Sequence, residues 1–547
     1  MTDPASATQA GFARLRVFWQ QVRHHGPSQL QFWVIALILG IAAGYATIGF
    51  RLSISFLQEL IYGADDVTLA SAAAQLHWVW IVTIPVLGGL AVGILLSRFT
   101  PDCRVRSVAH VIEGAAVGEG RVEKKVARVS ALASLITLST GGSTGREGPV
   151  VHLGAAISTA ISDWLRVDGV TARDLMGCAV ASAVAASFNA PLAGCIFALE
   201  VVLRHFAFHA FAPIAIASVA GAVVGRLHLG DGPEFVIPDQ MLSFYVELPA
   251  FMILGLLSGF VAVVMMKSIF LAEDTASWVQ ERLRIPHFLR PAIAGLFLGL
   301  IATQFPHIIG VGYETTYLAL NGRIALGAAV VFAVVKVIAV SITVGGRMGG
   351  GVFSPALMLG ALTGIAFGSV ATGIFPDFSG AQTVYALAGM AAVAAAVMGG
   401  PISTTLIAFE LTGDWQIGIA VLVSVSLATI VSSRMVAKSF FLTQIERRGV
   451  HIAEGPQAYL LGTISVGRIM RRDDGPAPEA VADMIAQGAF VEVEATLEAV
   501  LPRLDAADDA ALPVVSADRR YLGMLHHGDA WKAYAEAMAA TAREEHA

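Results

Sequence analysis

Residues 141–150 read Gly-Gly-Ser-Thr-Gly-Arg-Glu-Gly-Pro-Val, and they place one arginine and one glutamate between two uncharged, helix-forming runs. Those runs extend over residues 132–145 and 148–162. A charged side chain at membrane depth costs about 2.5–3.5 kcal/mol, so such a residue is usually retained for function. Pro149 suits the first turn of a helix, where its missing N–H is not needed. The stretch therefore predicts a loop that leads into a helix N-terminus inside a membrane, where free backbone N–H groups favour an anion.

The composition of the 547-residue chain is that of a helical membrane protein, with 56% hydrophobic and only 14% charged residues. Soluble globular proteins are about a quarter charged. Uncharged apolar runs recur between residues 32 and 431, which predicts an all-α, multi-pass membrane protein. Arg14, Arg16 and Arg23 precede the first run, so the positive-inside rule predicts a cytoplasmic N-terminus. We expect a bacterial inner membrane with both termini cytoplasmic.

The chain divides into four predicted parts. Residues 1–31 form a cytoplasmic N-terminal segment, residues 32–450 the membrane domain and residues 451–462 a linker, and residues 463–547 form a small unit. From residue 462 onward there are 8 Lys/Arg and 15 Asp/Glu, a net charge of about −7, whereas the whole chain carries −6. This charge asymmetry predicts that the C-terminal part is a separate soluble unit.

Two blocks of the first half of the membrane domain recur in the second half. The pattern Gly-x3-Pro-x3-Leu-Gly-Ala starts at Gly145 and again at Gly351, and the pattern Ala-Ala-x4-Pro-x6-Ala-x-Glu ends at Glu200 and again at Glu410. Matched Gly/Pro interruptions indicate an internal repeat with a binding site at the interface of its halves, because broken helices at membrane depth are tolerated where they are buried or line a cavity. The predicted halves are residues 32–228 and 247–437.

Five motifs, taken together and in order, resemble those of the CLC family of chloride channels and proton-coupled anion antiporters. They are the Gly-Arg-Glu-Gly-Pro of residues 145–149, the Gly-Gly-Gly-Val-Phe-Ser-Pro of residues 349–355, the Phe-Asn-Ala-Pro-Leu-Ala-Gly of residues 188–194, the Gly-Val-Gly-Tyr-Glu of residues 310–314 and the Glu-Leu-Thr-Gly-Asp of residues 410–414. The resemblance covers about residues 30–450. It implies an inverted repeat of broken and tilted helices, and a homodimer in membrane lipid with one anion pathway per subunit. The function that it implies is anion permeation, as in voltage-gated chloride channels.

The resemblance also implies roles for particular residues. Glu147 is expected to be the gating glutamate, whose carboxylate occupies the anion site as a tethered competitor until protonation removes its charge. Residues of the two glycine-rich loops are expected to bind the anion; these are Arg146, Gly148, Val352 and Phe353. The alternative for Glu147 is a buried ion pair with Arg146.

Two predicted anion-binding positions depart from the family pattern. The Val-Arg-Ser-Val-Ala of residues 105–109 stands where the family has Gly-Ser-Gly-Ile-Pro, so that Arg106, followed by Ser107, falls at the coordinating serine. Phe441 stands where the family has a coordinating tyrosine. A guanidinium suits planar oxyanions, so one hypothesis is a selectivity that includes bicarbonate or nitrate beside chloride. The alternative is that Arg106 turns to the cytoplasmic vestibule and raises the local anion concentration.

A third departure concerns protons. Antiporters of the family carry a second glutamate after the first one of the Asn-Ala-Pro helix, and here Glu200 is followed by Val201. Valine cannot carry a proton, which favours a channel or an uncoupled transporter over a proton-coupled antiporter. His152 can titrate near neutral pH, but we interpret it as a hydrogen-bonded core residue.

The sequence gives less support to other functions. Residues 141–145 match the Gly-x-Ser-x-Gly pattern of serine hydrolases, but that pattern requires a preceding strand, whereas the sequence here is helical. An intramembrane serine hydrolase with Ser143 as nucleophile is therefore the alternative from another functional class. His-Glu-x-x-His, Cys-x-x-Cys and Walker patterns do not occur in the sequence, so we expect no enzyme activity, metal, cofactor or nucleic acid partner.

The C-terminal unit resembles a CBS domain, a small α/β module found beneath many CLC membrane domains. The similar stretches are residues 464–470, 512–515 and 523–525, followed by Asp529. His526 replaces the usual Thr or Ser before this aspartate, and the connecting region is short. We therefore expect a dimerising or gating support and not an adenine nucleotide site.

Overall fold

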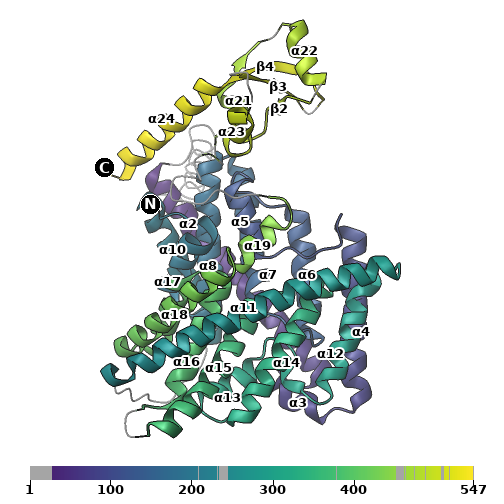
Figure 1. Ribbon diagram of the computed structural model, residues 1–547, viewed down its shortest axis with the longest axis vertical. Coiled ribbons are helices and arrows are strands. Elements are labelled where there is room, and N and C mark those ends of the chain that lie inside the picture. Colours follow the sequence, from purple (N-terminus) through teal and green to yellow (C-terminus); the bar gives the residue numbers. More distant parts are fainter. Residues whose placement is uncertain are drawn as a thin grey trace, which may run out of the picture.

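A computed structural model describes residues 28–206, 208–230, 232, 244–376, 379–450, 461, 464–473, 475–486, 488–506, 511–516 and 518–545. It contains a large helical part and a smaller α/β unit near the C-terminus (Figure 1). Most of the predicted N-terminal segment and of the predicted linker lies outside the described residues.

We divide the helical part between residues 229 and 244 into a first and a second half. In chain order, the helices of the first half are α2 (Gln29–Tyr62), α3 (Leu69–Gln75), α4 (Trp78–Phe99), α5 (Val108–Ala116), α6 (Lys124–Ser139), α7 (Glu147–Leu165), α8 (Gly169–Phe188), α9 (Pro191–Phe197), the π-helix η1 (Ala198–Leu203) and α10 (Phe208–Leu229). Those of the second half are α11 (Phe244–Arg282), η2 (His287–Leu289), α12 (Arg290–Ala302), η3 (Pro306–Ile308), α13 (Tyr313–Leu320), α14 (Leu326–Gly345), α15 (Phe353–Ile374), α16 (Gln382–Met398), α17 (Pro401–Thr412), α18 (Trp415–Met435) and α19 (Phe440–Glu446).

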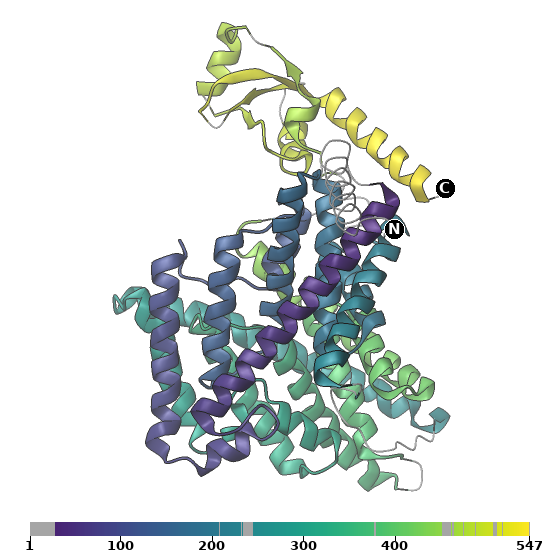
Figure 2. The same ribbon diagram turned by 180° about the vertical axis from the view of Figure 1, so that it is seen from behind.

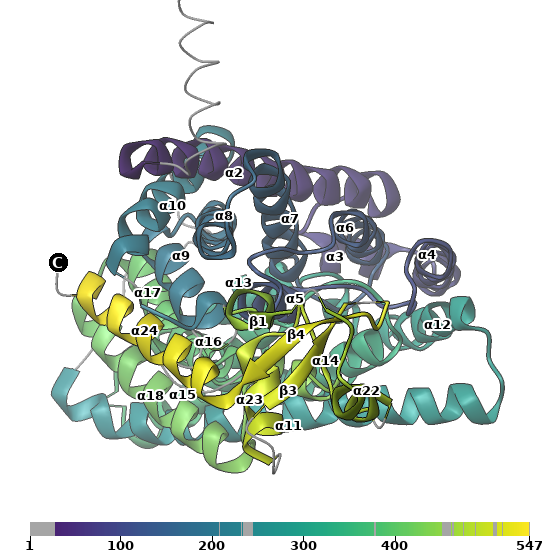
Figure 3. The ribbon, with the colours of Figure 1, turned by 90° about the horizontal axis from the view of Figure 1, so that it is seen from above.

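Seven helices among the described residues are long and apolar enough to cross a membrane. They are Gln29–Tyr62, Trp78–Phe99, His209–Leu229, Val246–Arg282, Leu326–Gly345, Phe353–Ile374 and Trp415–Glu446. The long α2 crosses the helical part obliquely (Figure 2). Viewed along the vertical axis of Figure 1, α2 runs along one edge of the molecule while α11 and α18 lie along the opposite edge (Figure 3). The fold is thus a bundle of tilted helices.

The interruptions that the sequence predicts are helix ends. Helix α8 ends at Phe188, Asn189 has a left-handed φ of 55°, and α9 begins with Pro191. Helix α16 ends before Gly399, whose φ is 74°, and α17 begins with Pro401. A left-handed residue ends a helix, and proline at the next helix start has a compatible φ and needs no N–H partner. The two halves therefore carry the same break in the same place.

The centre of the bundle consists of small apolar residues. Residues 175–188 of α8 and 384–398 of α16 are all buried, and most of them are alanine, glycine, valine or serine. Small residues allow backbones to approach closely where lipid supplies no hydrophobic driving force. A Cβ at Gly364 of α15 would lie 2.0 Å from the Tyr385 carbonyl oxygen of α16. These buried helices hold the loops of the functional site in place.

The C-terminal unit is an α/β domain, in agreement with the predicted fold class. Its strands are β1 (Arg471–Arg472), β2 (Val491–Glu492), β3 (Ala511–Val515) and β4 (Tyr521–His526), in the sheet order β1-β4-β3-β2. Strand β2 is parallel to β3, and β3 is antiparallel to β4. Its helices are α21 (Val466–Ile469), α22 (Glu479–Ala486), α23 (Leu497–Ala506) and α24 (His527–Glu545). The unit stands at the end of the bundle where α2 begins (Figures 1 and 2). Its dimerising role remains a prediction.

Candidate functional site

The two glycine-rich loops meet through reciprocal hydrogen bonds. The Gly145 N–H donates to the Gly351 carbonyl oxygen at 2.7 Å, and the Gly351 N–H donates to the Gly145 carbonyl oxygen at 2.8 Å. These glycines occupy equivalent places in the two repeats, so this antiparallel pairing relates the loops by a local two-fold axis. Helix α7 begins two residues after Gly145 and α15 begins two residues after Gly351. The N-termini of two helices from different halves therefore meet.

One position of this contact can only be glycine. Gly350 has a φ of 128°, a conformation that side chains rarely allow. A Cβ there would also lie 2.1 Å from Oγ1 of Thr144, in the opposite loop. The glycine cluster of residues 349–351 thus lets the two loops approach closely.

Glu147 reaches across this contact. Its side chain is buried, with 5% of the residue exposed. The Ser354 hydroxyl, in the first turn of α15, donates a short hydrogen bond to Oε2 of Glu147. The carboxylate of a residue in the first half therefore lies at the N-terminus of a helix in the second half, where the helix dipole and free amides favour a negative charge.

Arg146 points to a different group of buried side chains. Its Nη1 lies 3.5 Å from Oδ2 of Asp66, and its Nε lies 3.8 Å from Oε1 of Glu147. Gln58 donates from Nε2 to the other oxygen of Asp66 at 2.8 Å. Arg146 is thus shared between two carboxylates, and the one that it approaches more closely is Asp66.

A small cavity of about 40 Å³ lies beside the Glu147 carboxylate. Such a volume holds about one or two water-sized particles. Most of the predicted site residues line it, namely Ser107, Glu147, Gly148, Val352, Phe353 and Phe441. Phe188, which the sequence marks only as the first residue of the Phe-Asn-Ala-Pro motif, also lines the cavity. Residues that the sequence did not indicate complete the wall, and they include Val184, Phe197, Met398, Phe440 and Gln444.

Arg106 does not line the small cavity. Its Nη1 lies 2.7 Å from Oδ2 of Asp102 and 3.2 Å from Nε2 of His110, and its backbone N–H donates to Oγ of Ser130 at 2.9 Å. Ser107, one residue later, caps the N-terminus of α5 and faces the cavity instead. The Arg106 side chain therefore turns away from the small cavity and toward a larger space, which is the second of the two positions that the sequence allowed for it.

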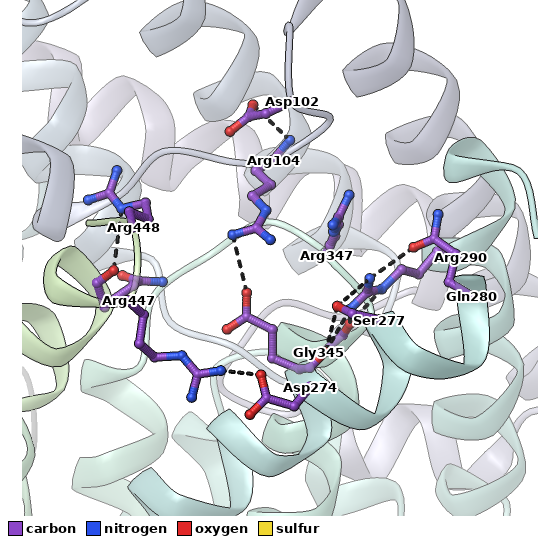
Figure 4. A network of polar contacts seen from close by, with 12 residues as sticks. Asp102, Arg104, Asp274, Ser277, Gln280, Arg290, Gly345, Arg347, Arg447 and Arg448 are labelled. Carbon is purple, nitrogen blue, oxygen red and sulfur yellow. Dashed lines mark hydrogen bonds and ion pairs between the residues drawn. The ribbon is translucent and has the colours of Figure 1, made fainter. Parts of the chain in front are cut away.

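That larger space is a cavity of about 350 Å³ that adjoins the small one. We call it the arginine-lined cavity, because its wall contains Arg104, Arg106, Arg347, Arg447 and Arg448. Figure 4 shows side chains of this wall converging from different segments of the chain. The two cavities share Ser107, Val344, Gly350 and Gln444. An ion in the large cavity is therefore next to the small one.

The sequence profile of the voltage gated chloride channel family matches residues 88–433. The chain belongs to the CLC family. A ClcB-like chloride channel protein of Ralstonia nicotianae is 30% identical over 387 residues, which are 70% of this chain and 89% of that protein. The H(+)/Cl(-) exchange transporter ClcA of Vibrio vulnificus is 28% identical over 436 residues, which are 79% of this chain and 92% of that protein.

Solved structures share the CLC fold. A slow cyanobacterial Cl−/H+ antiporter superposes with a TM-score of 0.67 at 20% identity, over 76% of this chain and 97% of that one. A eukaryotic CLC transporter superposes with a TM-score of 0.65 at 19% identity, over 90% of this chain and 86% of that one. Membership of the CLC family, which the sequence profile and the curated relatives show, makes the chain an integral membrane protein of an anion-transport family and not an enzyme.

This CLC membership excludes the serine hydrolase. Ser143 lies in the loop between helices α6 and α7 with no strand before it, and its buried hydroxyl has no hydrogen-bond partner among the described residues. His152 is buried in α7 with its ring centroid 6.4 Å from that of His110. Neither residue lines the small cavity.

The repeat places two glutamates in exchanged positions, which the sequence patterns did not predict. Glu200 of the first half accepts hydrogen bonds from the N–H groups of Ile402 (2.9 Å) and Ser403 (2.8 Å) at the start of α17. Glu410 of the second half accepts from the N–H groups of Leu192 (2.9 Å) and Ala193 (2.8 Å) at the start of α9. Each half therefore caps a helix of the other. Val201, next to Glu200, is buried in the π-helix η1 and carries no titratable group.

Proposed function

We propose that this CLC protein moves chloride and similar small monovalent anions across the membrane, and that Glu147 gates the pathway. The observation that supports this proposal is the position of the Glu147 carboxylate at the N-terminus of α15, beside a cavity of the size of a small ion. A carboxylate in that place has the charge and the hydrogen-bond demand of the anion that it would displace.

The gating step follows from the charge of this group. While it is ionised, the carboxylate holds the Ser354 hydroxyl and the positive end of α15. When it is protonated, it loses most of this attraction, and a free anion can take its place. The aromatic wall of Phe188, Phe353 and Phe441 keeps the cavity small and leaves few polar groups beside those of the two loops.

The proposed transport is uncoupled from protons. At the position of the inner proton relay, Val201 is buried and cannot accept a proton. Its neighbour Glu200 uses both carboxylate oxygens to cap α17. The alternative is proton-coupled antiport, which the name of the ClcA relative states for that protein.

Reconstituted liposomes test both parts of this proposal. We expect the purified chain to release chloride from loaded vesicles while an internal pH indicator shows no proton movement at a fixed ratio to chloride. Vesicles without protein, treated with a proton ionophore, give the background rates of chloride release and proton movement. Proton movement at a constant ratio to chloride would establish the antiporter, and vesicles that retain every small anion would exclude the proposed function.

Anion selectivity should follow Phe441 more than Arg106, because only Phe441 lines the small cavity. We expect Arg106→Ser to lower the flux of all anions together and to change the ratios of chloride, nitrate and bicarbonate flux by less than about twofold, since the substitution acts on local anion concentration. Phe441→Tyr adds a hydroxyl to the cavity wall and should change these ratios. Flux ratios that change with Arg106→Ser and not with Phe441→Tyr would instead support the bicarbonate- or nitrate-preferring alternative.

We also infer that the side of the C-terminal unit is cytoplasmic. Arg447 and Arg448 lie just before the connection to this unit, and the other arginines of the arginine-lined cavity lie with them. Positive charge near the ends of membrane helices marks the cytoplasmic side. The homodimer that the resemblance implies remains a prediction, which crosslinking in native membranes can test.

A further inference from the structure

The arginine-lined cavity gathers five guanidinium groups from three segments. Arg104 and Arg106 come from the loop before α5, Arg347 comes from the glycine-rich loop before α15, and Arg447 and Arg448 follow α19. Figure 4 shows Arg104, Arg347, Arg447 and Arg448 around an open space. Five positive charges around one cavity repel one another, so negatively charged groups nearby are needed to stabilise the cluster.

Within the described residues, the carboxylates that contact these arginines do not balance their charges. Four arginines each contact one carboxylate, and the pairs are Arg104–Glu273 (3.5 Å), Arg106–Asp102 (2.7 Å), Arg448–Glu113 (2.9 Å) and Arg447–Asp274. Five arginines and four carboxylates leave a net charge of +1. Each guanidinium has five N–H donors, so these contacts also leave donors available.

Arg347 carries the unbalanced charge. In the part of the chain that the structure describes, no carboxylate lies within ion-pair distance of it, and its contact is with Nδ1 of His287 at 3.5 Å. Its buried Nε has no hydrogen-bond partner among the described residues. Burial, together with the nearby Arg104, lowers the pKa of Arg347. The site therefore disfavours the positive charge of this side chain, although the more distant Glu273 and Asp102 partly offset the effect.

The backbone conformation of Arg347 also indicates a functional role. Its φ is 59°, in the left-handed region that residues other than glycine seldom occupy. Glycines surround it in the sequence at positions 345, 346 and 349–351, yet this position holds an arginine. Such strain persists where the surroundings impose it, and it is concentrated at functional sites.

The dimensions of the cavity restrict the ligand. With about 350 Å³ it is much larger than the adjoining small cavity of about 40 Å³. A halide or nitrate ion would leave most of it filled with water. An anion with several oxygens can accept from several guanidinium forks at once, and it can also accept from the Gln444 side-chain amide in the same wall.

We propose that the arginine-lined cavity binds a multivalent tetrahedral oxyanion, either inorganic phosphate or the phosphate group of a nucleotide, and that this ligand obstructs the entry of small anions. The ligand is too large for the small cavity and lies against the four residues that the two cavities share. The obstruction rests on the proposed function, whereas the binding does not.

Binding is measured first, on the full chain in detergent. Isothermal titration with inorganic phosphate at low salt should give saturable binding, which Arg347→Gly should weaken about tenfold, because one charged group with its hydrogen bonds is lost. Glycine fits a left-handed φ, so this variant should fold at least as well as the parent. Arg284→Gly is the matched control, since Arg284 also has a left-handed φ (52°) but is exposed and outside the cavity.

Each binding result either supports the proposed site or contradicts it. Saturable phosphate binding that Arg347→Gly weakens and Arg284→Gly preserves supports the site. Undetectable phosphate binding, or binding that both variants preserve, overturns it. Titration with ATP distinguishes a nucleotide from inorganic phosphate as the ligand. If the site binds nucleotides, ATP should bind more tightly than phosphate, and its binding should depend on Arg347. If the site binds free phosphate, phosphate should bind more tightly than ATP.

The flux experiment then tests the obstruction. Chloride efflux from vesicles with phosphate on both sides should fall at the concentrations that saturate binding, and Arg347→Gly should restore it. Efflux that is unchanged at saturating phosphate overturns the obstruction. A parent chain that moves no anion under any condition, but binds phosphate through Arg347, would contradict the proposed function and still support the site.

Discussion

Glu147→Gln is expected to raise chloride flux near neutral pH by about tenfold or more and to remove its response to acid. A hydrogen bond to a charged group contributes about 1.5–3 kcal/mol, and 1.4 kcal/mol corresponds to a factor of ten in occupancy. The Ser354 hydroxyl makes such a bond to the carboxylate, and the start of α15 adds the attraction of its dipole. Glutamine keeps the size of the side chain but has no charge to compete with the anion. Flux into vesicles, measured over a range of pH, gives both quantities.

The sign of the acid response in the parent follows from the same group. In the proposed gate the ionised carboxylate occupies the anion site, so flux should rise as pH falls and the group is protonated. Ser354→Ala removes one donor to the carboxylate and should raise flux near neutral pH by less than Glu147→Gln does. Glu59→Gln is the matched control, because Glu59 is an exposed glutamate on α2. A Glu147→Gln variant with the flux and the acid response of the parent would show that Glu147 is not the gate.

The sequence predicted the parts of the site that depend on local chemistry. Pro149 and Pro355 mark the first turns of α7 and α15, and Pro191 and Pro401 begin α9 and α17. Proline at a helix start, after glycine or asparagine, is a local signal that one sequence carries in full. The offset of 206 residues between Gly145 and Gly351 likewise indicated that the two loops are equivalent, and the structure brings these two glycines into contact.

What the sequence could not give depends on side-chain direction and on long-range contacts. Arg106 and Ser107 are adjacent, and only the contacts of Arg106 with Asp102 and His110 decide which of them faces the small cavity. The arginine-lined cavity joins Arg104 to Arg448, which lie more than 300 residues apart in the sequence. No local pattern marks such a cluster, because each arginine alone resembles an ordinary charge at a helix end.

Removing both exchanged glutamates is expected to have the largest effect on stability. Glu200 and Glu410 each accept from two backbone N–H groups at a helix start of the other half, and alanine leaves all four without these partners. We expect a cost of about 2 kcal/mol for either alanine substitution and about 4 kcal/mol for Glu200→Ala with Glu410→Ala, since each loses two hydrogen bonds to a charged group that is partly exposed to solvent. Unfolding midpoints and half-lives at raised temperature in detergent measure these losses.

The corresponding glutamines separate the hydrogen bonds from the charge. Glutamine retains one acceptor oxygen, so each glutamine variant should lose about half as much stability as the alanine variant. Glu446→Ala, which removes an exposed ion pair with Lys438, is the control and should cost less than about 1 kcal/mol. Alanine variants of Glu200 and Glu410 that are no less stable than this control would show that the caps do not hold the halves together.

These caps also bear on the question of protons. Both oxygens of Glu200 are engaged at the start of α17, so this glutamate cannot serve as the proton relay that we propose is absent at Val201 unless it releases two backbone amides. A proton path through Glu200 would therefore require the local opening of a helix start that joins the two halves. If any proton movement accompanies chloride in the parent, Glu200→Gln should leave its ratio to chloride unchanged while lowering stability, because this charge serves the fold and not the transport.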